Sequence, residues 1–451
     1  MRLSGTKTGS ANQYCGLGNQ LYDLAGSRPS LDLRFAESKS LNDSITGSNL
    51  ITFTRSSTAT YYDSAGVIQT ASTDTPRFDH DPVTGECLGL LIEDARTNLF
   101  PYSEIQIGSD GWSQSSGQTP VDLSLNALGV FDGVRLTSNG QTWHGIKTNL
   151  GQLPTLTAST SYVYSVWFKP GDLDPSNKLR LQIRDTSLGS GLLVRKTISS
   201  SDHFSASSYT VGSVPTQGTA EVLSVENAGD SVIRLNIKFV PAATSTNYQV
   251  NIGPNTGTVG KSIIALGFQI EEDENPSSYI PTNGSTATRS VDVANITGTN
   301  FSSWYGNNEG TVFSECLFRS NGGTTQFSYA FSDGLTTDEI YQYKQINNDN
   351  VTFTIRDSVD GTTFNQNHQN AMQYGQQTKG AIAFASNNAF SDVDDRTEKT
   401  QDNSVTMPVL NQIRFGERVN GSGRPFLTIN RFTYWPSRLP NDTLGTITKQ
   451  F

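Results

Sequence analysis

Short stretches in which apolar and polar residues alternate are the feature that most constrains this chain. From Ile233 to Phe239 an apolar residue stands at every second position, and the stretch from Leu179 to Ile183 follows the same rule. A period of two is typical of a β-strand with one buried face. Glycine, proline and asparagine separate these stretches along the 451-residue chain, as expected for tight turns. The sequence therefore predicts an all-β fold.

The strand pattern divides the chain into four parts. Residues 1–30 are weakly patterned and predict an extended N-terminal arm, which is either a flexible tail or a segment that orders against a neighbouring subunit. Residues 31–100 carry short strands and a hairpin signal at Asp63–Gly66, and predict a β-rich connector module. Residues 101–290 repeat the pattern on a larger scale, which predicts a jelly roll, and a further set of strands occupies 291–451.

Composition excludes several classes of protein. Hydrophobic residues make up only 34% of the chain, but aromatic residues reach 10% and are spaced too regularly for general disorder. The net charge of -10 repels phosphate backbones, so nucleic-acid binding is not expected. There is no apolar run of about 18 residues, so membrane insertion is not expected. The stretch from Met1 to Tyr14 has no apolar core of a secretory signal.

Three stretches between residues 53 and 99 point to a biological setting. They are Phe-Thr-Arg-Ser-Ser-Thr-Ala-Thr-Tyr at 53–61, Pro-Arg-Phe-Asp-His-Asp-Pro at 76–82, and Gly-Leu-Leu-Ile-Glu-Asp-Ala-Arg-Thr-Asn-Leu at 89–99. Together they resemble a module of tailed-phage and prophage structural proteins. In that family the module is a connector that precedes a jelly roll similar to carbohydrate-binding modules.

Two later regions extend the resemblance to residues 31–451. The jelly roll of the family closes with a strand, an acidic turn and a Tyr-Ile-Pro-Thr segment, and these resemble 267–272, 278–282 and Thr288-Arg289. The stretch 432–440 resembles the final strand and helix of a concanavalin/laminin-G-like sandwich. The resemblance implies tandem β-sandwiches, a jelly roll followed by a concanavalin/laminin-G-like domain.

The same resemblance implies a function. It indicates a virion protein assembled in the host cytoplasm: a tail fibre, a head fibre, or another appendage of the tail tip or baseplate. Its partners would be other virion proteins, copies of itself (a trimer if it is a fibre) and a host-surface glycan bound without catalysis. Two alternatives remain open, a purely architectural protein that decorates the capsid or joins tail parts, and a polysaccharide depolymerase.

Glycan binding requires aromatic rings that stack on sugars and amides that bind hydroxyl groups. Trp112, Trp143 and His144 stand in polar, loop-like surroundings, and Tyr305 is followed by Asn307. These five residues are the predicted glycan-binding residues. Each aromatic residue alone is also compatible with a packing role.

Acidic residues provide the remaining candidates. Asp392, Asp394 and Asp395 occur in a polar loop, and alternate carboxylates of this kind are Ca²⁺ ligands in some proteins; the alternative is a solvated loop. No cofactor other than Ca²⁺ is predicted. The acidic run Glu271–Glu274 is interpreted as a solvated turn, because neighbouring strand residues point to opposite faces and glycoside hydrolysis needs two facing carboxylates. The sequence therefore predicts no catalytic residues.

Overall fold

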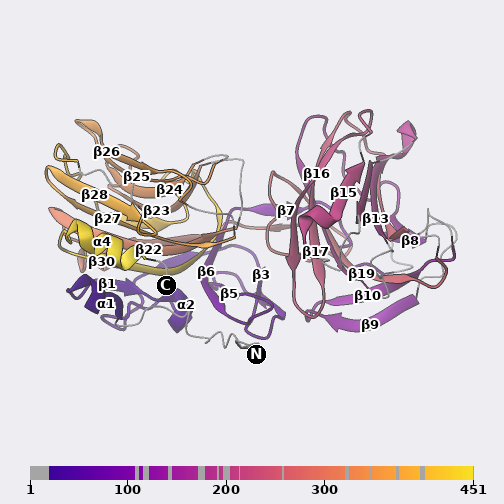
Figure 1. Cartoon of the computed structure of the whole chain (residues 1–451), viewed down its shortest axis with the longest axis horizontal. Helices are drawn as coiled ribbons and strands as arrows, with labels where there is room; N and C mark the ends of the chain where they lie inside the picture. Colours follow the sequence, from indigo (N-terminus) through magenta and orange to yellow (C-terminus); the bar gives the residue numbers. More distant parts are fainter. Residues whose placement is uncertain are drawn as a thin grey trace, which may run out of the picture.

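The chain folds into two β-sandwiches that lie side by side and meet near β7 (Arg96–Asn98) (Figure 1). The computed structural model describes residues 20–106, 111–114, 121–140, 145–170, 178–189, 192–196, 204–212, 214–255, 258–319, 325–345, 348–371, 375–396 and 402–449. The prediction of an all-β chain with tandem sandwiches is confirmed. Within these ranges, no helix has the length and apolar character needed to span a lipid bilayer.

The jelly roll consists of two six-stranded antiparallel sheets. The first, here called the β12 sheet, runs in the order β16 (Gly218–Asn227), β17 (Ile233–Pro241), β12 (Tyr162–Lys169), β19 (Ser262–Glu272), β10 (Phe131–Thr137) and β9 (Val121–Ala127). The second, the β13 sheet, runs in the order β15 (Tyr209–Gly212), β14 (Leu192–Lys196), β13 (Lys178–Asp185), β18 (Tyr248–Asn255), β11 (Ile146–Thr148) and β8 (Trp112–Gln114). Apolar side chains of both sheets form one buried core between them.

The second sandwich also has two sheets. The β30 sheet contains β28 (Asn388–Val393), β27 (Gln377–Ala385), β22 (Glu309–Phe318), β30 (Phe426–Trp435), β6 (Cys87–Glu93) and β5 (Phe78–His80), and β1 (Leu31–Leu33) also pairs with β30. The β23 sheet contains β2 (Thr52–Thr54), β21 (Val293–Thr297), β29 (Gln412–Phe415), β23 (Gln326–Ser332), β24 (Glu339–Lys344), β25 (Val351–Asp357) and β26 (Gly361–His368).

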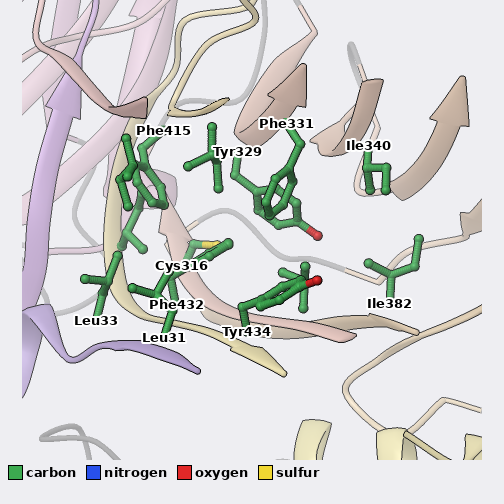
Figure 2. Packing of buried hydrophobic residues seen from close by; sticks show 14 of the residues in the cluster. Leu31, Leu33, Cys316, Tyr329, Phe331, Ile340, Ile382, Phe415, Phe432 and Tyr434 are labelled. Carbon is green, nitrogen blue, oxygen red and sulfur yellow. The ribbon is translucent and has the colours of Figure 1, made fainter. Parts of the chain in front are cut away.

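Aromatic side chains fill the space between these two sheets. Figure 2 shows Phe432 of the β30 sheet facing Tyr329 and Phe415 of the β23 sheet. The ring of Phe432 meets those of Tyr329 and Phe415 edge to face, at centroid distances of 5.2 Å and 5.1 Å. Edge-to-face contacts of this kind add stability beyond the burial of apolar area.

The jelly roll is an insertion in the second sandwich. The chain leaves the second sandwich through β7 and returns through β20 (Ala287–Arg289), and these two crossing strands pair with each other. The segment 31–100 is therefore not a separate connector module. Most of its strands belong to the two sheets of the second sandwich, because β1 and β6 pair with β30 and β2 pairs with β21, and only β3 and β4 pair with each other in a separate two-stranded sheet. The predicted boundary between 31–100 and 291–451 does not exist as a division of the fold.

Residues 20–30 do not form part of an extended arm. Helix α1 (Gln20–Ala25) packs with the C-terminal helix α4 (Asn441–Thr448) over Trp435, which donates a 3.0 Å hydrogen bond to the carbonyl oxygen of Ser27. The remainder of the predicted arm, residues 1–19, lies outside the described residues. The short helices α2 (Phe35–Ser38) and α3 (Gly298–Ser302) belong to the second sandwich.

The jelly roll turns one face towards the second sandwich. The hairpin of β3 (Ala59–Tyr62) and β4 (Ile68–Ala71) covers the outer face of the β12 sheet, where Ile68 packs in one cluster with Phe131 and Trp167. Two short 3-10 helices, Thr186–Leu188 and Ala206–Ser208, complete the jelly roll. The β13 sheet forms the side of the jelly roll away from this contact.

Five charged residues, Arg55, Arg77, Glu93, Arg289 and Asp292, form a buried cluster where the chain enters and leaves the jelly roll; this cluster is called the junction network. Each is at most 1% exposed. The carboxylate of Asp292 lies 3.0 Å from a guanidinium nitrogen of Arg55 and 2.5 Å from one of Arg77. The carboxylate of Glu93 lies 2.7 Å from Arg77 and 3.4 Å from Arg289.

The jelly roll contributes directly to this network. Ser278, which follows the last jelly-roll strand, donates hydrogen bonds to Glu93 from its backbone nitrogen at 2.9 Å and from its hydroxyl at 2.7 Å. Glu93 therefore binds cations of the second sandwich and a segment of the jelly roll at the same time. Because buried charges are costly unless paired, the network favours one relative position of the two sandwiches.

Replacing Asp292 by alanine tests the importance of the network. Asp292→Ala leaves Arg55 and Arg77 buried without this counter-charge, so we expect the free energy of unfolding to fall by about 3–5 kcal/mol. Glu37→Ala is the control, because Glu37 pairs with Arg34 at 3.4 Å in an exposed position and should contribute less than about 1 kcal/mol. Urea unfolding followed by circular dichroism measures both. Equal losses in the two variants would contradict a central role for Asp292.

The stability of the protein should also depend on the ionisation of Glu93. Burial alone would raise the pKa of its carboxyl group, but Arg289, Arg77 and Ser278 lower the pKa from 4.5 to about 2. A pKa lowered by folding means that the carboxylate stabilises the fold above its unfolded pKa, and that this stabilisation is lost as the pH falls from 4.5 to about 2. Glu93→Gln should be less stable at pH 7 and should lose less stability across this window. Parallel pH profiles of the urea midpoints would contradict this expectation.

Candidate functional site

The outer face of the β13 sheet carries a group of cationic and amide side chains. Along β13, Leu179, Leu181 and Ile183 point into the core, so Arg180, Gln182 and Arg184 point outwards. The register places residues of neighbouring strands beside them: Gln182 pairs with Asn251, Asn251 with Lys147, and Arg184 with Gln249. We call these six outward residues the cationic face; they are Lys147, Arg180, Gln182, Arg184, Gln249 and Asn251.

The amide side chains of the cationic face are held in place. Gln249 donates a 2.7 Å hydrogen bond to the carbonyl oxygen of Thr148, and Asn251 donates one of 3.5 Å to Gln182. Arg180, Gln182, Gln249 and Asn251 are only 2–6% exposed, although they lie on the outer side of the sheet. These four side chains are therefore buried, unlike those of a typical solvated strand face, whereas Lys147 and Arg184 are half-buried.

The charged residues of this face, Lys147, Arg180 and Arg184, are all cationic. Burial, together with the charge of Arg184, lowers the pKa of Arg180 to about 10, so Arg180 remains a cation at neutral pH. The Nε atom of Arg184 is buried and has no hydrogen-bond partner in the described part of the chain. Asp185 is the one acidic residue in these six strands, and its carboxylate accepts hydrogen bonds from Ser187 at 2.8 Å and 2.6 Å. An anion bound here would offset the positive charge.

A pocket of about 420 Å³ opens on the second sandwich, and it brings together two of the predicted residues, Tyr305 and Asn307. We call it the distal pocket. Helix α3 forms one wall, and the loop before β29 forms another. The polar residues that line it are Thr297, Ser302, Asn307, Asn411 and Gln412. The apolar and aromatic ones are Phe301, Tyr305 and Leu410.

Backbone contacts hold the two walls of the distal pocket. The side chain of Asn300 in α3 donates a 3.2 Å hydrogen bond to the carbonyl oxygen of Leu50. In the facing loop, Asn411 donates to the carbonyl oxygens of Ser332 and Asp333 at 3.0 Å and 2.9 Å. The pocket thus lies between segments that are fixed to the ends of the β23 sheet.

Tyr305 is part of an aromatic cluster at the base of the distal pocket. Its ring lies 4.6 Å from that of Phe301, 5.5 Å from that of Phe331 and 5.3 Å from that of Tyr434. Burial and the neighbouring Tyr434 raise the pKa of the Tyr305 hydroxyl, so this group stays neutral. That Tyr305 and Asn307 belong to one binding surface stays a prediction. The ring of Tyr305 is half-buried and forms a wall of the pocket, so it is not an exposed stacking platform.

The sequence predicted that Trp112 is an exposed glycan-binding residue, and this prediction is wrong. Trp112 is 1% exposed, its indole nitrogen donates a 3.0 Å hydrogen bond to the carbonyl oxygen of Tyr102, and its ring packs edge to face on Phe100 and Phe268 at 5.2 Å and 5.7 Å. The polar residues around it belong to the edge strand β8, which points Trp112 into the core. The other two predicted jelly-roll residues, Trp143 and His144, lie outside the described residues.

Replacing Trp112 should therefore affect stability. Trp112→Ala removes a large buried side chain and is expected to lower the free energy of unfolding by about 3–5 kcal/mol. Gln114→Ala is a control on the same strand, because Gln114 is exposed and should change stability by less than about 0.5 kcal/mol. Differential scanning calorimetry measures both. A fully stable Trp112→Ala variant would show that the ring is not an essential core residue.

The three aspartates predicted to bind Ca²⁺ do not form a metal site. Asp392 is fully buried on β28, whereas Asp394 and Asp395 follow the strand in the left-handed region at φ 52° and 51°. The carboxylate of Asp394 accepts a 2.9 Å hydrogen bond from the backbone nitrogen of Lys379. Among the described residues, no group of three or more His, Cys, Asp or Glu side chains is arranged to hold a metal ion.

The acidic run Glu271–Glu274 is only partly the solvated turn that the sequence predicts. Glu272 is exposed, but Glu271 is fully buried and accepts hydrogen bonds from the hydroxyl and the backbone nitrogen of Ser277. Glu274 pairs with Lys238. The carboxylates of Glu271 and Glu274 thus have separate partners.

Comparisons with known proteins give loose structural likenesses. No protein-family model matches the sequence, and no curated protein matches it either. Among solved structures, the CBM40 domain of the Ruminococcus gnavus IT-sialidase bound to α2,3-sialyllactose has 12% sequence identity and a TM-score of 0.29, and the match covers 32% of this chain and 84% of that one. A mutant NanB sialidase from Streptococcus pneumoniae has 11% identity and a TM-score of 0.29, and the match covers 34% of this chain and 26% of that one. The binding domain of botulinum neurotoxin serotype D has 11% identity and a TM-score of 0.27, and the match covers 39% of this chain and 44% of that one.

Proposed function

We propose that this chain is a non-catalytic structural protein of a tailed-phage virion, namely a component of a tail fibre, a head fibre or another appendage. In this proposal it binds an acidic host-surface glycan through its cationic face. The virion setting rests on the three stretches between residues 53 and 99 and their resemblance to phage structural modules. The glycan-binding role rests on one observation, the row of arginine and amide side chains on the outer side of the β13 sheet.

The chemistry of the cationic face suits a sugar that carries a carboxylate. Guanidinium groups form strong, directional hydrogen bonds with carboxylates, and Arg180 and Arg184 offer two of them on one strand. The amides of Gln182 and Asn251 are groups that bind sugar hydroxyls. A bound carboxylate would also lie favourably beside the two guanidinium charges.

Non-catalytic binding is the simplest role for this face. Glycoside hydrolysis requires two carboxyl groups that flank the scissile bond. Asp185, the one acidic residue of the β13 sheet, has its carboxylate engaged by Ser187 at the end of β13. This supports binding over depolymerisation as the function of the cationic face.

An architectural role is the second candidate, and the edge strand β9 favours it. β9 is the last strand of the β12 sheet, and its Val121 and Leu125 side chains are 50% and 39% exposed. An exposed edge strand with apolar side chains is a surface on which another chain can add a strand. β9 would then join copies of this chain or other virion proteins, with or without glycan binding elsewhere.

The glycan proposal is tested by replacing Arg184 in the full chain. We expect α2,3-sialyllactose or a glucuronate oligosaccharide to bind more tightly than lactose. Arg184→Gln should lower the affinity for these acidic probes about 10- to 100-fold, because a charge-assisted hydrogen bond is lost. Arg135→Gln is the matched control, because Arg135 is an exposed arginine on the β12 sheet. Isothermal titration calorimetry at two salt concentrations provides the measurement.

Two results would contradict this proposal. One is equal affinity for acidic and neutral probes, which would remove the role of charge. The other is equal weakening by Arg184→Gln and Arg135→Gln, which would place the effect in the overall charge of the protein. If the folded chain binds no glycan at all, the architectural role becomes the better explanation.

A further inference from the structure

We infer that the distal pocket is a second, independent ligand site and that its ligand is a neutral sugar. The pocket lies at the end of the second sandwich that faces away from the junction network. Strand β21 begins immediately after Asp292 of that network and ends at Thr297, which lines the pocket. The five residues of β21 place Thr297 roughly 16 Å from Asp292 along the strand. The site is therefore distinct from the cationic face, which belongs to the other sandwich.

The size and charge of the distal pocket define the class of ligand. Its volume of about 420 Å³ falls within the range of roughly 300–1,000 Å³ that is typical of small-molecule sites. The described residues that line it carry no charged side chain, and the Tyr305 hydroxyl stays protonated because burial raises its pKa. A charged ligand would lose its hydration and find no counter-charge in this lining. A neutral polar ligand has no charge to compensate.

The polar groups of the pocket are available to a ligand. The side chains of Thr297, Ser302, Asn307 and Gln412 line the pocket and make no hydrogen bond to any described part of the chain. Ser302 and Asn307 are exposed, and Gln412 is half-buried. Hydroxyl and amide groups that converge on one space without internal partners match the hydroxyl groups of a sugar, each of which both donates and accepts.

The apolar part of the pocket complements the less polar face of a sugar ring. Phe301 and Tyr305 form one wall, and their rings lie 4.6 Å apart at an angle of 32°. Leu410 contributes from the opposite loop. Because Tyr305 also packs on Phe331 and Tyr434, its ring does not need to be ordered when the ligand binds. A rigid aromatic wall lowers the entropic cost of binding.

The pocket has exposed apolar neighbours that extend the surface around it. Leu335 is 62% exposed and follows Gly334, which lies next to the side chain of Gln412. Val409 is 70% exposed and precedes Leu410 of the pocket. Exposed apolar residues of this kind, grouped in loops, are typical of interaction surfaces. A glycan longer than one sugar residue would reach them.

The experiment uses the full chain and a panel of neutral probes, the methyl glycosides of glucose, galactose, mannose and N-acetylglucosamine. Ligand-observed saturation-transfer NMR detects binding, and titration gives the affinity. Ser302→Trp fills the pocket and should abolish binding of the probe that the parent protein binds. Asn307→Ala removes one hydrogen-bonding group and should lower the affinity for that probe about 2- to 10-fold.

The chain offers a matched control for each variant. Ser303 and Asn308 are exposed neighbours of the same residue types that do not line the pocket, so Ser303→Trp and Asn308→Ala should bind like the parent protein. Arg184→Gln should also leave the neutral probe unaffected, which separates this site from the cationic face. Circular dichroism confirms that each variant is folded.

The inference fails if the parent protein binds none of the four glycosides. It also fails if a bound glycoside is unaffected by both Ser302→Trp and Asn307→Ala. Loss of acidic-glycan binding in Arg184→Gln with neutral binding retained would support two sites, whereas loss of both kinds of binding in that variant would indicate one shared site on the jelly roll.

Discussion

The relative position of the two sandwiches depends on the requirement that buried charges be paired. Glu93 and Asp292 together neutralise arginines that come from distant parts of the chain, and Ser278 of the jelly roll binds Glu93 directly. The five charged residues of the network are each at most 1% exposed, so moving the jelly roll would leave a buried charge without its partners. The paired strands β7 and β20 cross between the sandwiches beside this network. The distance between the cationic face and the distal pocket is set by the same constraint.

Local sequence patterns predicted the strands but not their partners. The alternation from Ile233 to Phe239 is found as β17, with its apolar residues in the core. By contrast, Asp32 alternates with the apolar residues Leu31 and Leu33 and yet is fully buried, because Arg431, 399 positions later, binds its carboxylate. A period of two shows that two faces differ, but it does not identify the segment that covers each face. For the same reason, local patterns did not predict that the jelly roll is inserted between β7 and β20.

The candidate sites show the same limit. Polar neighbours suggested that Trp112 was exposed, but in a strand those neighbours simply occupy the opposite face. The cationic face had a signal in the alternation of Leu179 to Arg184, yet an outward row of arginine and glutamine normally means a solvated surface. Only the fold shows that Arg180 is buried and that Gln249 lies beside Arg184. Tyr305 and Asn307 could be placed together from their spacing, but the facing residue Gln412 comes from more than 100 positions away.

The pairing of β1 and β6 with β30 has a consequence for synthesis on the ribosome. At roughly 5–20 residues per second, about 20–80 s pass between the emergence of Asp32 and that of Arg431, its partner 399 positions later. The jelly roll closes on itself and can fold during that interval, whereas the N-terminal strands must wait with unpaired edges. Nascent or truncated chains would therefore present a finished jelly roll attached to open strands. Such chains would depend on chaperones, and early termination would yield an aggregation-prone product in place of a shorter working protein.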